Sequence, residues 1–150
     1  MAQTIYFDMD GTLADLYSVF NWLGKLRSED ATPYMDAKPL IRMALLARLL
    51  NGLQKQGYQI GIISWLSKES SRAYEVEVSI AKEEWLKKHL PSVTWDKVYF
   101  IPYGVPKAEA ANIQPFDILF DDEQANIEAW ERAGGWGFSP SEIFETLRKM

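Results

Sequence analysis

The sequence TIYFDMDGTL, residues 4–13, decides the fold. Its first four residues are β-branched or aromatic, which is typical of a buried strand. Two carboxylates, Asp8 and Asp10, follow this strand, and Gly11 then permits a tight turn. Ligands of an open parallel sheet bind beyond the carboxyl ends of its strands. We therefore expect Asp8 and Asp10 at a binding edge, where a Mg²⁺ ion could bridge them; the alternative interpretation is an acidic turn after a strand.

Four more short apolar runs follow, separated by longer stretches with helical periodicity. The expected strands are residues 4–7, 58–63, 98–101, 117–120 and 135–138, and the expected helices are residues 39–56, 71–90 and 123–134. A last helix is expected after Ser139, because Pro140 suits the first helical position and Glu142 can complete a capping box. This alternation predicts an α/β fold, a three-layer, Rossmann-like open parallel sheet of five strands with helices on both faces.

The composition is that of one soluble domain over residues 1–150. Hydrophobic residues make up 47% and charged residues 25% of the chain, so a true core is expected. The absence of cysteine excludes disulfides, thiolate metal sites and a cysteine nucleophile, and it suits a cytoplasmic protein. A net charge of -5 argues against extended nucleic-acid binding. We expect no export signal and no membrane span, and the sequence does not specify an oligomeric state.

Polar side chains stand at three further strand ends. Ser64 closes the second strand, where its hydroxyl could donate to a phosphate oxygen or simply begin a turn. Lys107 follows the third strand on a proline-stiffened loop, where its ammonium group could reach a nucleophile; alone, it would be an ordinary surface lysine. The fourth strand ends in the acidic pair Asp121 and Asp122, which are poor packing residues and good metal ligands.

Electrostatics explains why these groups belong together. Two carboxylates about 4 Å apart repel each other by roughly 4 kcal/mol at an effective dielectric constant of about 20. A cluster of four would move apart unless cations relieved the repulsion. One Mg²⁺ ion and one lysine would do so, and the metal would also offset the charge of a phosphate monoester. The expected cluster of carboxylates thus predicts Mg²⁺ as the cofactor.

These four motifs, in this order, resemble those of the haloacid dehalogenase superfamily over nearly the whole chain. The most specific part is DMDGT, residues 8–12, and Ser64, Lys107 and the acidic pair stand where the second, third and fourth motifs belong. Members that remove halide lack the second aspartate, so Asp10 indicates the phosphatase branch. The resemblance implies a single hydrolase domain that uses Mg²⁺ to hydrolyse a phosphate monoester.

The resemblance also implies the role of each residue. Asp8 would attack phosphorus and form an aspartyl phosphate. Asp10 would protonate the leaving group and later deprotonate the attacking water. The Asp8 carboxylate, the Asp10 backbone carbonyl and one acid of the pair would hold Mg²⁺, with Asp122 favoured as the direct ligand and Asp121 as its support. Lys107, Ser64 and backbone amides after Asp8 would stabilise the phosphoryl oxygens.

The substrate is expected to be small and phosphorylated. Only a minimal helical cap fits at about residues 13–38, and it contains several aromatic side chains: Tyr17, Phe20, Trp22 and Tyr34. They would pack the cap onto the sheet, or form with Trp65 a platform on which a base stacks. The opening stretch is also similar to the 5'(3')-deoxyribonucleotidase branch, which favours a nucleoside monophosphate. Candidate substrate-binding residues are Gly11, Thr12, Trp22 and Trp65.

Other functions stay open. Among phosphatases, the alternative substrates are sugar phosphates or phosphorylated macromolecules. A non-catalytic phosphoacceptor module is an alternative from a different functional class. Receiver domains of that class carry an acid after the third strand, where this chain has Ile101-Pro102-Tyr103. Structural roles are predicted for His89, near a helix end, and for Trp136, in the core. The mixed charges of residues 69–88 predict a solvated helix face.

Overall fold

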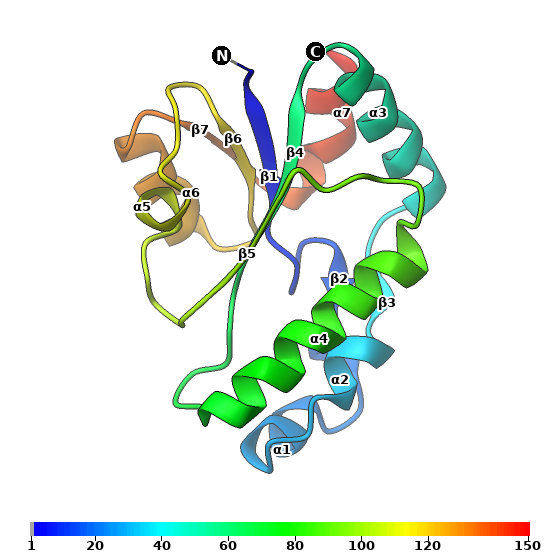
Figure 1. The fold of residues 1–150 in the computed structure, drawn as a ribbon, viewed down its shortest axis with the longest axis vertical. Helices are drawn as coiled ribbons and strands as arrows, with labels where there is room; N and C mark the ends of the chain where they lie inside the picture. Colours follow the sequence, from blue (N-terminus) through cyan, green and yellow to red (C-terminus); the bar gives the residue numbers. More distant parts are fainter. Residues whose placement is uncertain (1) are drawn as a thin grey trace.

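The computed structural model describes residues 2–150 and contains a five-stranded parallel sheet (Figure 1). Its strand order is β5-β4-β1-β6-β7. The strands are β1 (Thr4–Phe7), β4 (Gln59–Trp65), β5 (Lys97–Ile101), β6 (Ile118–Phe120) and β7 (Trp136–Phe138). The chain runs outward from β1 in one direction through β4 and β5, and then in the other through β6 and β7. The order of the strands therefore reverses beside β1, which is where open sheets of this kind bind ligands.

Helices cover both faces of the sheet. They are α3 (Met43–Lys55), α4 (Arg72–His89), α5 (Lys107–Ala111), α6 (Gln124–Arg132) and α7 (Ile143–Arg148), the last preceded by the 3-10 turn η2 (Pro140–Glu142). Helices α3, α4 and α7 contribute to the hydrophobic cluster on one face, and α5 and α6 contribute to the cluster on the other. The predicted three-layer α/β architecture is confirmed.

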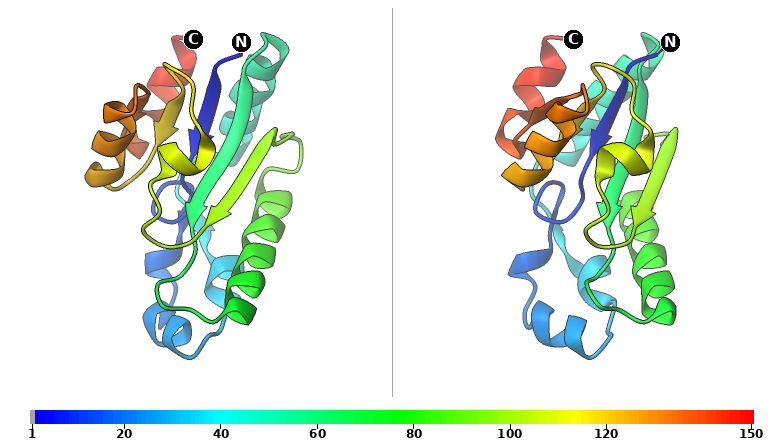
Figure 2. Two further views of the ribbon diagram at one scale, coloured as in Figure 1. Left: turned by 60° about the vertical axis from the view of Figure 1, so that its left-hand side comes forward. Right: turned by 90° about the vertical axis from the view of Figure 1, so that its left-hand side faces the viewer.

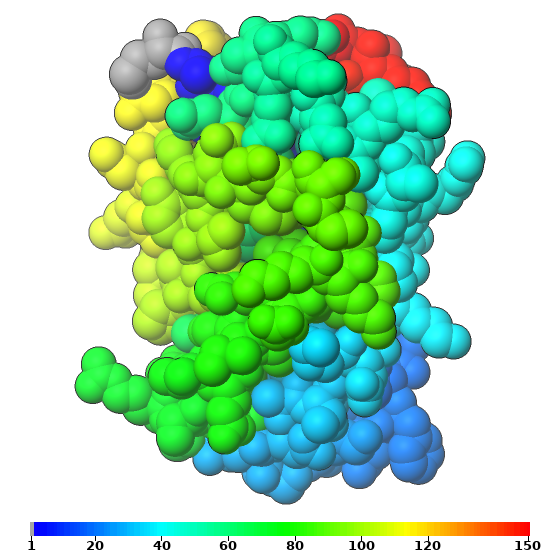
Figure 3. All heavy atoms as spheres, turned by 45° about the vertical axis from the view of Figure 1, so that its right-hand side comes forward, coloured from blue at the N-terminus to red at the C-terminus, as the bar shows by residue number. Residues whose placement is uncertain are grey.

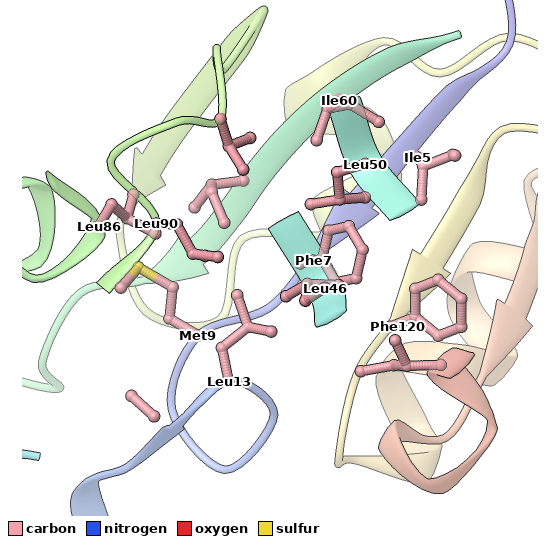
Figure 4. Packing of buried hydrophobic residues seen from close by; sticks show 14 of the residues in the cluster. Ile5, Phe7, Met9, Leu13, Leu46, Leu50, Ile60, Leu86, Leu90 and Phe120 are labelled. Carbon is pink, nitrogen blue, oxygen red and sulfur yellow. The ribbon is translucent and has the colours of Figure 1, made fainter. Parts of the chain in front are cut away.

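The side chains of β1 show why both faces must be covered. Ile5 and Phe7 pack toward α3, beside Leu46 and Leu50 (Figure 4), whereas Tyr6 packs against Trp130 of α6 on the opposite face. All six side chains are essentially inaccessible to solvent. A strand with large apolar side chains on both faces is stable only between two layers, because alternate side chains point to opposite faces.

A cap segment, residues 13–38, extends beyond the carboxyl ends of the strands (Figure 2). It contains β2 (Ala14–Asp15), the 3-10 turn η1 (Leu16–Ser18), α1 (Trp22–Arg27) and α2 (Thr32–Asp36), and β3 (Lys38–Pro39) pairs antiparallel with β2 at its base. Side chains attach the cap segment to α4 and the loop before it. Tyr34 Oη lies 2.8 Å from Ser67 Oγ, and the Glu29 carboxylate accepts hydrogen bonds from the backbone and hydroxyl of Ser71. Figure 3 shows the cap segment packed directly against α4.

Most predicted elements are confirmed with small shifts of their ends. The strand predicted at residues 58–63 continues through Ser64 to Trp65, and the helix predicted from residue 39 begins at Met43. Three predictions are wrong, and the third, the solvent exposure of Lys82, is described with the site. Lys107 opens the short helix α5 rather than lying on a loop. Trp136 is 48% exposed rather than in the core, because it lies on the edge strand β7 and packs against the exposed Phe116.

No helix within residues 2–150 has both the length and the apolar character needed to cross a bilayer.

Candidate active site

Asp8 lies where β1 ends, between its two neighbouring strands. Its backbone amide donates to the carbonyl of Phe120 at the end of β6, at 2.9 Å, so the pairing of these strands continues into the site. The carboxylate is held on both oxygens: Thr12 Oγ1 donates to Oδ2 at 3.0 Å, and Lys107 Nζ donates to Oδ1 at 2.9 Å. Asp8 is 6% exposed. This carboxylate therefore has a defined orientation at the sheet edge.

Lys107 joins the ends of β1 and β6 electrostatically. Its Nζ lies 2.9 Å from Asp8 Oδ1 and 2.7 Å from Asp121 Oδ2, and the residue is 5% exposed. Burial opposes the charged form of Lys107, but the charges of Asp8 and Asp121 outweigh it and raise the pKa above its usual value. The lysine thus remains an ammonium group. It lies beside the Asp8 carboxylate, as the sequence predicts.

The two members of the acidic pair have different surroundings. Asp121 is 1% exposed, and it accepts hydrogen bonds from Lys107, from the Glu123 amide at 2.9 Å and from Asn126 Nδ2 at 3.1 Å. Burial, with the charge of Asp8, raises the pKa of Asp121 to about 6. The carboxylate oxygens of Asp121 are therefore already occupied by hydrogen bonds within the protein. Asn126 lies in the first turn of α6, and no sequence pattern singles it out as a residue of the site.

Asp122 is exposed when the whole residue is considered, but its carboxylate lies close to the carboxylate of Asp8. Burial of the carboxylate and the charge of Asp8 raise the pKa of Asp122 to about 8. One carboxylate oxygen each from Asp8, Asp121 and Asp122 lie within 4.8 Å of one another. A single ammonium group does not neutralise three carboxylates, and a hard divalent ion with oxygen ligands would. The residues present fit Mg²⁺.

Asp10 takes a different position from this trio. Its carboxylate pairs with Lys82, whose Nζ lies 3.1 Å from Oδ2. Burial raises the pKa of Asp10, and the charge of Lys82 partly opposes this increase. One oxygen of the Asp10 carboxylate is therefore engaged by Lys82, which separates Asp10 from the Asp8, Asp121 and Asp122 group.

Lys82 is a residue of the site that the sequence does not single out. The prediction of a solvated face over residues 69–88 is wrong at this position, because Lys82 is 1% exposed. Its Nζ also donates to Ser64 Oγ at 2.7 Å and to the Trp65 carbonyl at 2.8 Å. The signal was present: Tyr74 and Val78 begin a buried stripe along α4, and position 82 continues it at a spacing of four residues. A lysine within an apolar stripe indicates a buried partner.

A cleft of about 390 Å³ opens above these groups. Asp8, Asp10, Ser64, Lys107 and the acidic pair supply charged and polar lining. The rest of the lining is mainly apolar and comes from the cap segment, the end of β4 and two loops: Leu16, Tyr17, Trp22, Leu23, Leu26, Tyr34, Trp65, Leu66 and Tyr103. The cleft thus combines charged groups with aromatic walls.

The predicted substrate-binding residues separate into two groups. Trp22 and Trp65 line the cleft, each in contact with a tyrosine: Trp22 with Tyr17 and Trp65 with Tyr103, both at 5.1 Å between ring centroids. Thr12 is fully buried, and its hydroxyl donates to Asp8 rather than facing the cleft. Gly11 has a φ of +83°, and a Cβ there would overlap the Asp122 carboxylate. The lack of a side chain at Gly11 therefore leaves room for the Asp122 carboxylate.

The protein is similar in fold to solved phosphatases. D,D-heptose 1,7-bisphosphate phosphatase from Burkholderia thailandensis matches with a TM-score of 0.54 and 11% identity, over 89% of this chain and 74% of that one. The enzyme of the same name from B. bronchiseptica, complexed with magnesium and phosphate, matches with a TM-score of 0.58 and 12% identity, over 90% and 78% of the two chains.

An uncharacterized protein from Corynebacterium glutamicum matches over 99% of this chain and 94% of its own, with a TM-score of 0.52 and 15% identity. The sequence matches no protein-family model and no curated protein. At these identities the likeness is one of fold. The chain therefore shares the fold of the two heptose bisphosphate phosphatases.

Proposed function

We propose that this chain is a phosphatase that hydrolyses a phosphate monoester through an aspartyl phosphate on Asp8. One observation carries the proposal: Asp8 is held by Thr12 and Lys107 among the charged groups that line a cleft, with Asp10 and Asp122 in the same cleft. A carboxylate fixed on both oxygens is a poor packing group and a well-oriented nucleophile. The fold shared with two phosphatases supports the same conclusion.

The reaction would proceed in two displacements. A carboxylate oxygen of Asp8 attacks phosphorus, the bond from phosphorus to the ester oxygen breaks, and Asp10 gives its proton to the departing alkoxide. A water molecule then loses a proton to Asp10 and attacks the same phosphorus. The bond from phosphorus to Asp8 breaks, which releases inorganic phosphate and restores the carboxylate. The ammonium group of Lys107 stabilises the phosphoryl charge in both steps.

Mg²⁺ would be held by the carboxylates of Asp8 and Asp122 and by the backbone carbonyl of Asp10. When bound, it would neutralise carboxylate and phosphate charge at once. Asp121 would support the site through Lys107, since its oxygens already accept hydrogen bonds from Lys107, Glu123 and Asn126.

The substrate that we propose is a nucleoside monophosphate. The aromatic lining of the cleft supports this, because the rings of Trp22, Trp65 and Tyr103 offer flat faces on which a base can stack, at about 1 to 3 kcal/mol per base. A sugar phosphate is the second candidate, favoured by the names of the two solved phosphatases. Rates with a panel of nucleotide and sugar monophosphates distinguish them, and a lack of preference for nucleotides would contradict the first.

The test of the reaction is hydrolysis of p-nitrophenyl phosphate with and without Mg²⁺. The native chain should require Mg²⁺, and Asp8→Asn should lower turnover by about 10³-fold or more, because the amide is not a nucleophile. The exposed Asp36 of α2 provides a control, and Asp36→Asn should retain native turnover. Retained Mg²⁺-dependent activity in Asp8→Asn would overturn the mechanism. A long-lived aspartyl phosphate without turnover would instead support a phosphoacceptor module.

A further inference from the structure

Lys82 has three polar partners beneath the active site. Its ammonium group donates hydrogen bonds to Ser64 Oγ at 2.7 Å and to the Trp65 carbonyl at 2.8 Å. It also forms an ion pair with Asp10, with Nζ 3.1 Å from Oδ2. Lys82 is 1% exposed and is not among the residues that line the cleft. It therefore touches two residues of the site without reaching the place where a substrate would bind.

The hydrogen bond from Lys82 to Ser64 determines to which groups the Ser64 hydroxyl can donate. Because Lys82 donates to Ser64 Oγ, that oxygen is the acceptor, and the one hydroxyl proton must point to another group. Ser64 lines the cleft beside Asp8. An acceptor in the cleft, such as a phosphoryl oxygen, is where that proton can be donated. Lys82 thus turns Ser64 into a hydrogen-bond donor toward the substrate.

The contact with Asp10 restricts the carboxylate. Lys82 holds Oδ2, so that Oδ1 is the oxygen available to exchange a proton with a leaving group or with water. The ammonium group also lies 5.3 Å from the ring of Tyr34 and 6.0 Å from the ring of Phe100, which confine it from other sides. A buried lysine is costly unless its partners compensate it. Here the partners are two residues of the site.

We propose that Lys82 is a positioning residue of this phosphatase, which holds Asp10 for proton transfer and directs the Ser64 hydroxyl at the phosphoryl group. The proposal rests on the proposed function. Lys82 acts through Asp10 and Ser64 and does not itself contact the substrate. Its loss should therefore affect steps that need Asp10 more than steps that do not.

The test compares two leaving groups in Lys82→Met. Glycerol phosphate has a basic alkoxide leaving group that needs protonation, whereas p-nitrophenyl phosphate releases a weakly basic phenolate that hardly does. With glycerol phosphate, kcat should fall by about 10²- to 10⁴-fold, the usual contribution of general acid catalysis. With p-nitrophenyl phosphate, the first turnover should remain within about tenfold of native. A burst of about one nitrophenolate per active site should follow, because hydrolysis of the aspartyl phosphate still needs Asp10.

Two further variants separate positioning from a merely structural role. Lys87 lies on the same helix with its side chain 72% exposed, so Lys87→Met should behave as the native chain does. In an Asp10→Asn background, Lys82→Met should lower the rate with glycerol phosphate by less than about tenfold, because the effect through Asp10 is already lost and only the effect through Ser64 remains. This double variant removes both charges of the pair. It therefore keeps the test valid should Lys82→Met alone fail to fold.

An equal decrease for both substrates without a burst, or independent effects of the two substitutions, would overturn the proposal while the native chain remains an active phosphatase. A native chain with no phosphatase activity would overturn the proposed function, and this inference with it.

Discussion

Asp121 and Asp122 are adjacent in sequence and have different surroundings. The oxygens of Asp121 are occupied by Lys107, Glu123 and Asn126, whereas the carboxylate of Asp122 lies beside Asp8. Both residues follow the end of β6 and line the cleft. The division between them therefore lies in their hydrogen-bond partners.

This division predicts distinct effects of removing each charge. Asp122→Asn should raise the Mg²⁺ concentration needed for half-maximal activity by about tenfold or more, because metal affinity follows the number of charged ligands. Asp121→Asn should shift that concentration by less than about threefold and lower kcat instead, since Lys107 loses an anionic acceptor. Mg²⁺ titrations of p-nitrophenyl phosphate hydrolysis measure both. The reverse pattern would assign the direct ligand to Asp121.

Gly11 carries a constraint that only a glycine satisfies. Its φ is +83°, and an added Cβ would overlap the Asp122 carboxylate and approach the ring of Tyr17 at 3.1 Å. Gly57 offers a matched control, because its φ is +103° with no atom within 4 Å of an added Cβ. The two positions share backbone strain and differ in their neighbours.

We expect Gly11→Ala to lower kcat by about 100-fold, the typical cost of moving a catalytic group by about 1 Å. Gly57→Ala should keep the native rate to within about twofold. Both variants should lose about 1 to 2 kcal/mol of stability, because positive φ is unfavourable for alanine. Steady-state kinetics and urea unfolding measure the two effects. Equal kinetic losses in both variants would show that strain, rather than overlap with Asp122, is the cause.

At the scale of elements, β6 is joined to β1 through a buried carboxylate far from the cleft. Asp117 is 1% exposed and accepts from the amides of Thr4 and Gln114, both at 2.9 Å. Its own carbonyl accepts from Trp130 Nε1 at 2.8 Å. These contacts fix the start of β6 relative to the amino end of β1 and the last turn of α6. They thereby help to place the acidic pair, at the other end of β6, beside Asp8.

Asp117→Ala should lower the free energy of unfolding by about 3 kcal/mol, because the buried amide of Thr4 and the partly buried amide of Gln114 would lose a charged acceptor. Asp117→Asn retains one carbonyl acceptor and should cost about half as much. The kcat of the folded protein should change by less than about threefold in either variant. Urea unfolding followed by circular dichroism provides the measurement. A loss below about 0.5 kcal/mol in Asp117→Ala would mean that water replaces the carboxylate.

For the whole molecule, the acidic edge links stability to pH and to metal. The pKa values of Asp121 and Asp122 in the folded protein are raised to about 6 and about 8, above the ordinary value of about 3.9. The folded protein therefore binds more protons than the unfolded chain between about pH 4 and 8. The free energy of unfolding of the metal-free protein should fall as pH rises through this window.

Mg²⁺ should reverse that loss, because it binds ionised carboxylates and competes with protons. The increase in Tm on adding Mg²⁺ should therefore be larger at pH 8 than at pH 5. Thermal unfolding with MgCl₂ or with a chelator at these two pH values measures it. Asp122→Asn, which lacks the carboxyl group with the higher pKa, should show a smaller dependence. An increase in Tm that does not vary with pH would place Mg²⁺ elsewhere.

Local sequence patterns suffice to predict the architecture and the polar edge of the sheet. Runs such as residues 4–7 are β-branched or aromatic at every position, which is typical of strands covered on both faces, and parallel strands bring their carboxyl ends to one edge. That argument predicted the positions of Asp8, Ser64 and Lys107 without coordinates. It needs only local patterns and the rule that side chains alternate along a strand.

The tertiary structure alone decided which polar groups pair. Lys82 is one charged residue among many on α4, and only the packing of that helix against β4 brings its ammonium group to Asp10 and Ser64. Trp136 has the spacing of a core residue, and only its place on the edge strand β7 leaves it exposed. Burial and pairing depend on contacts between residues distant in the chain, and no local pattern encodes them.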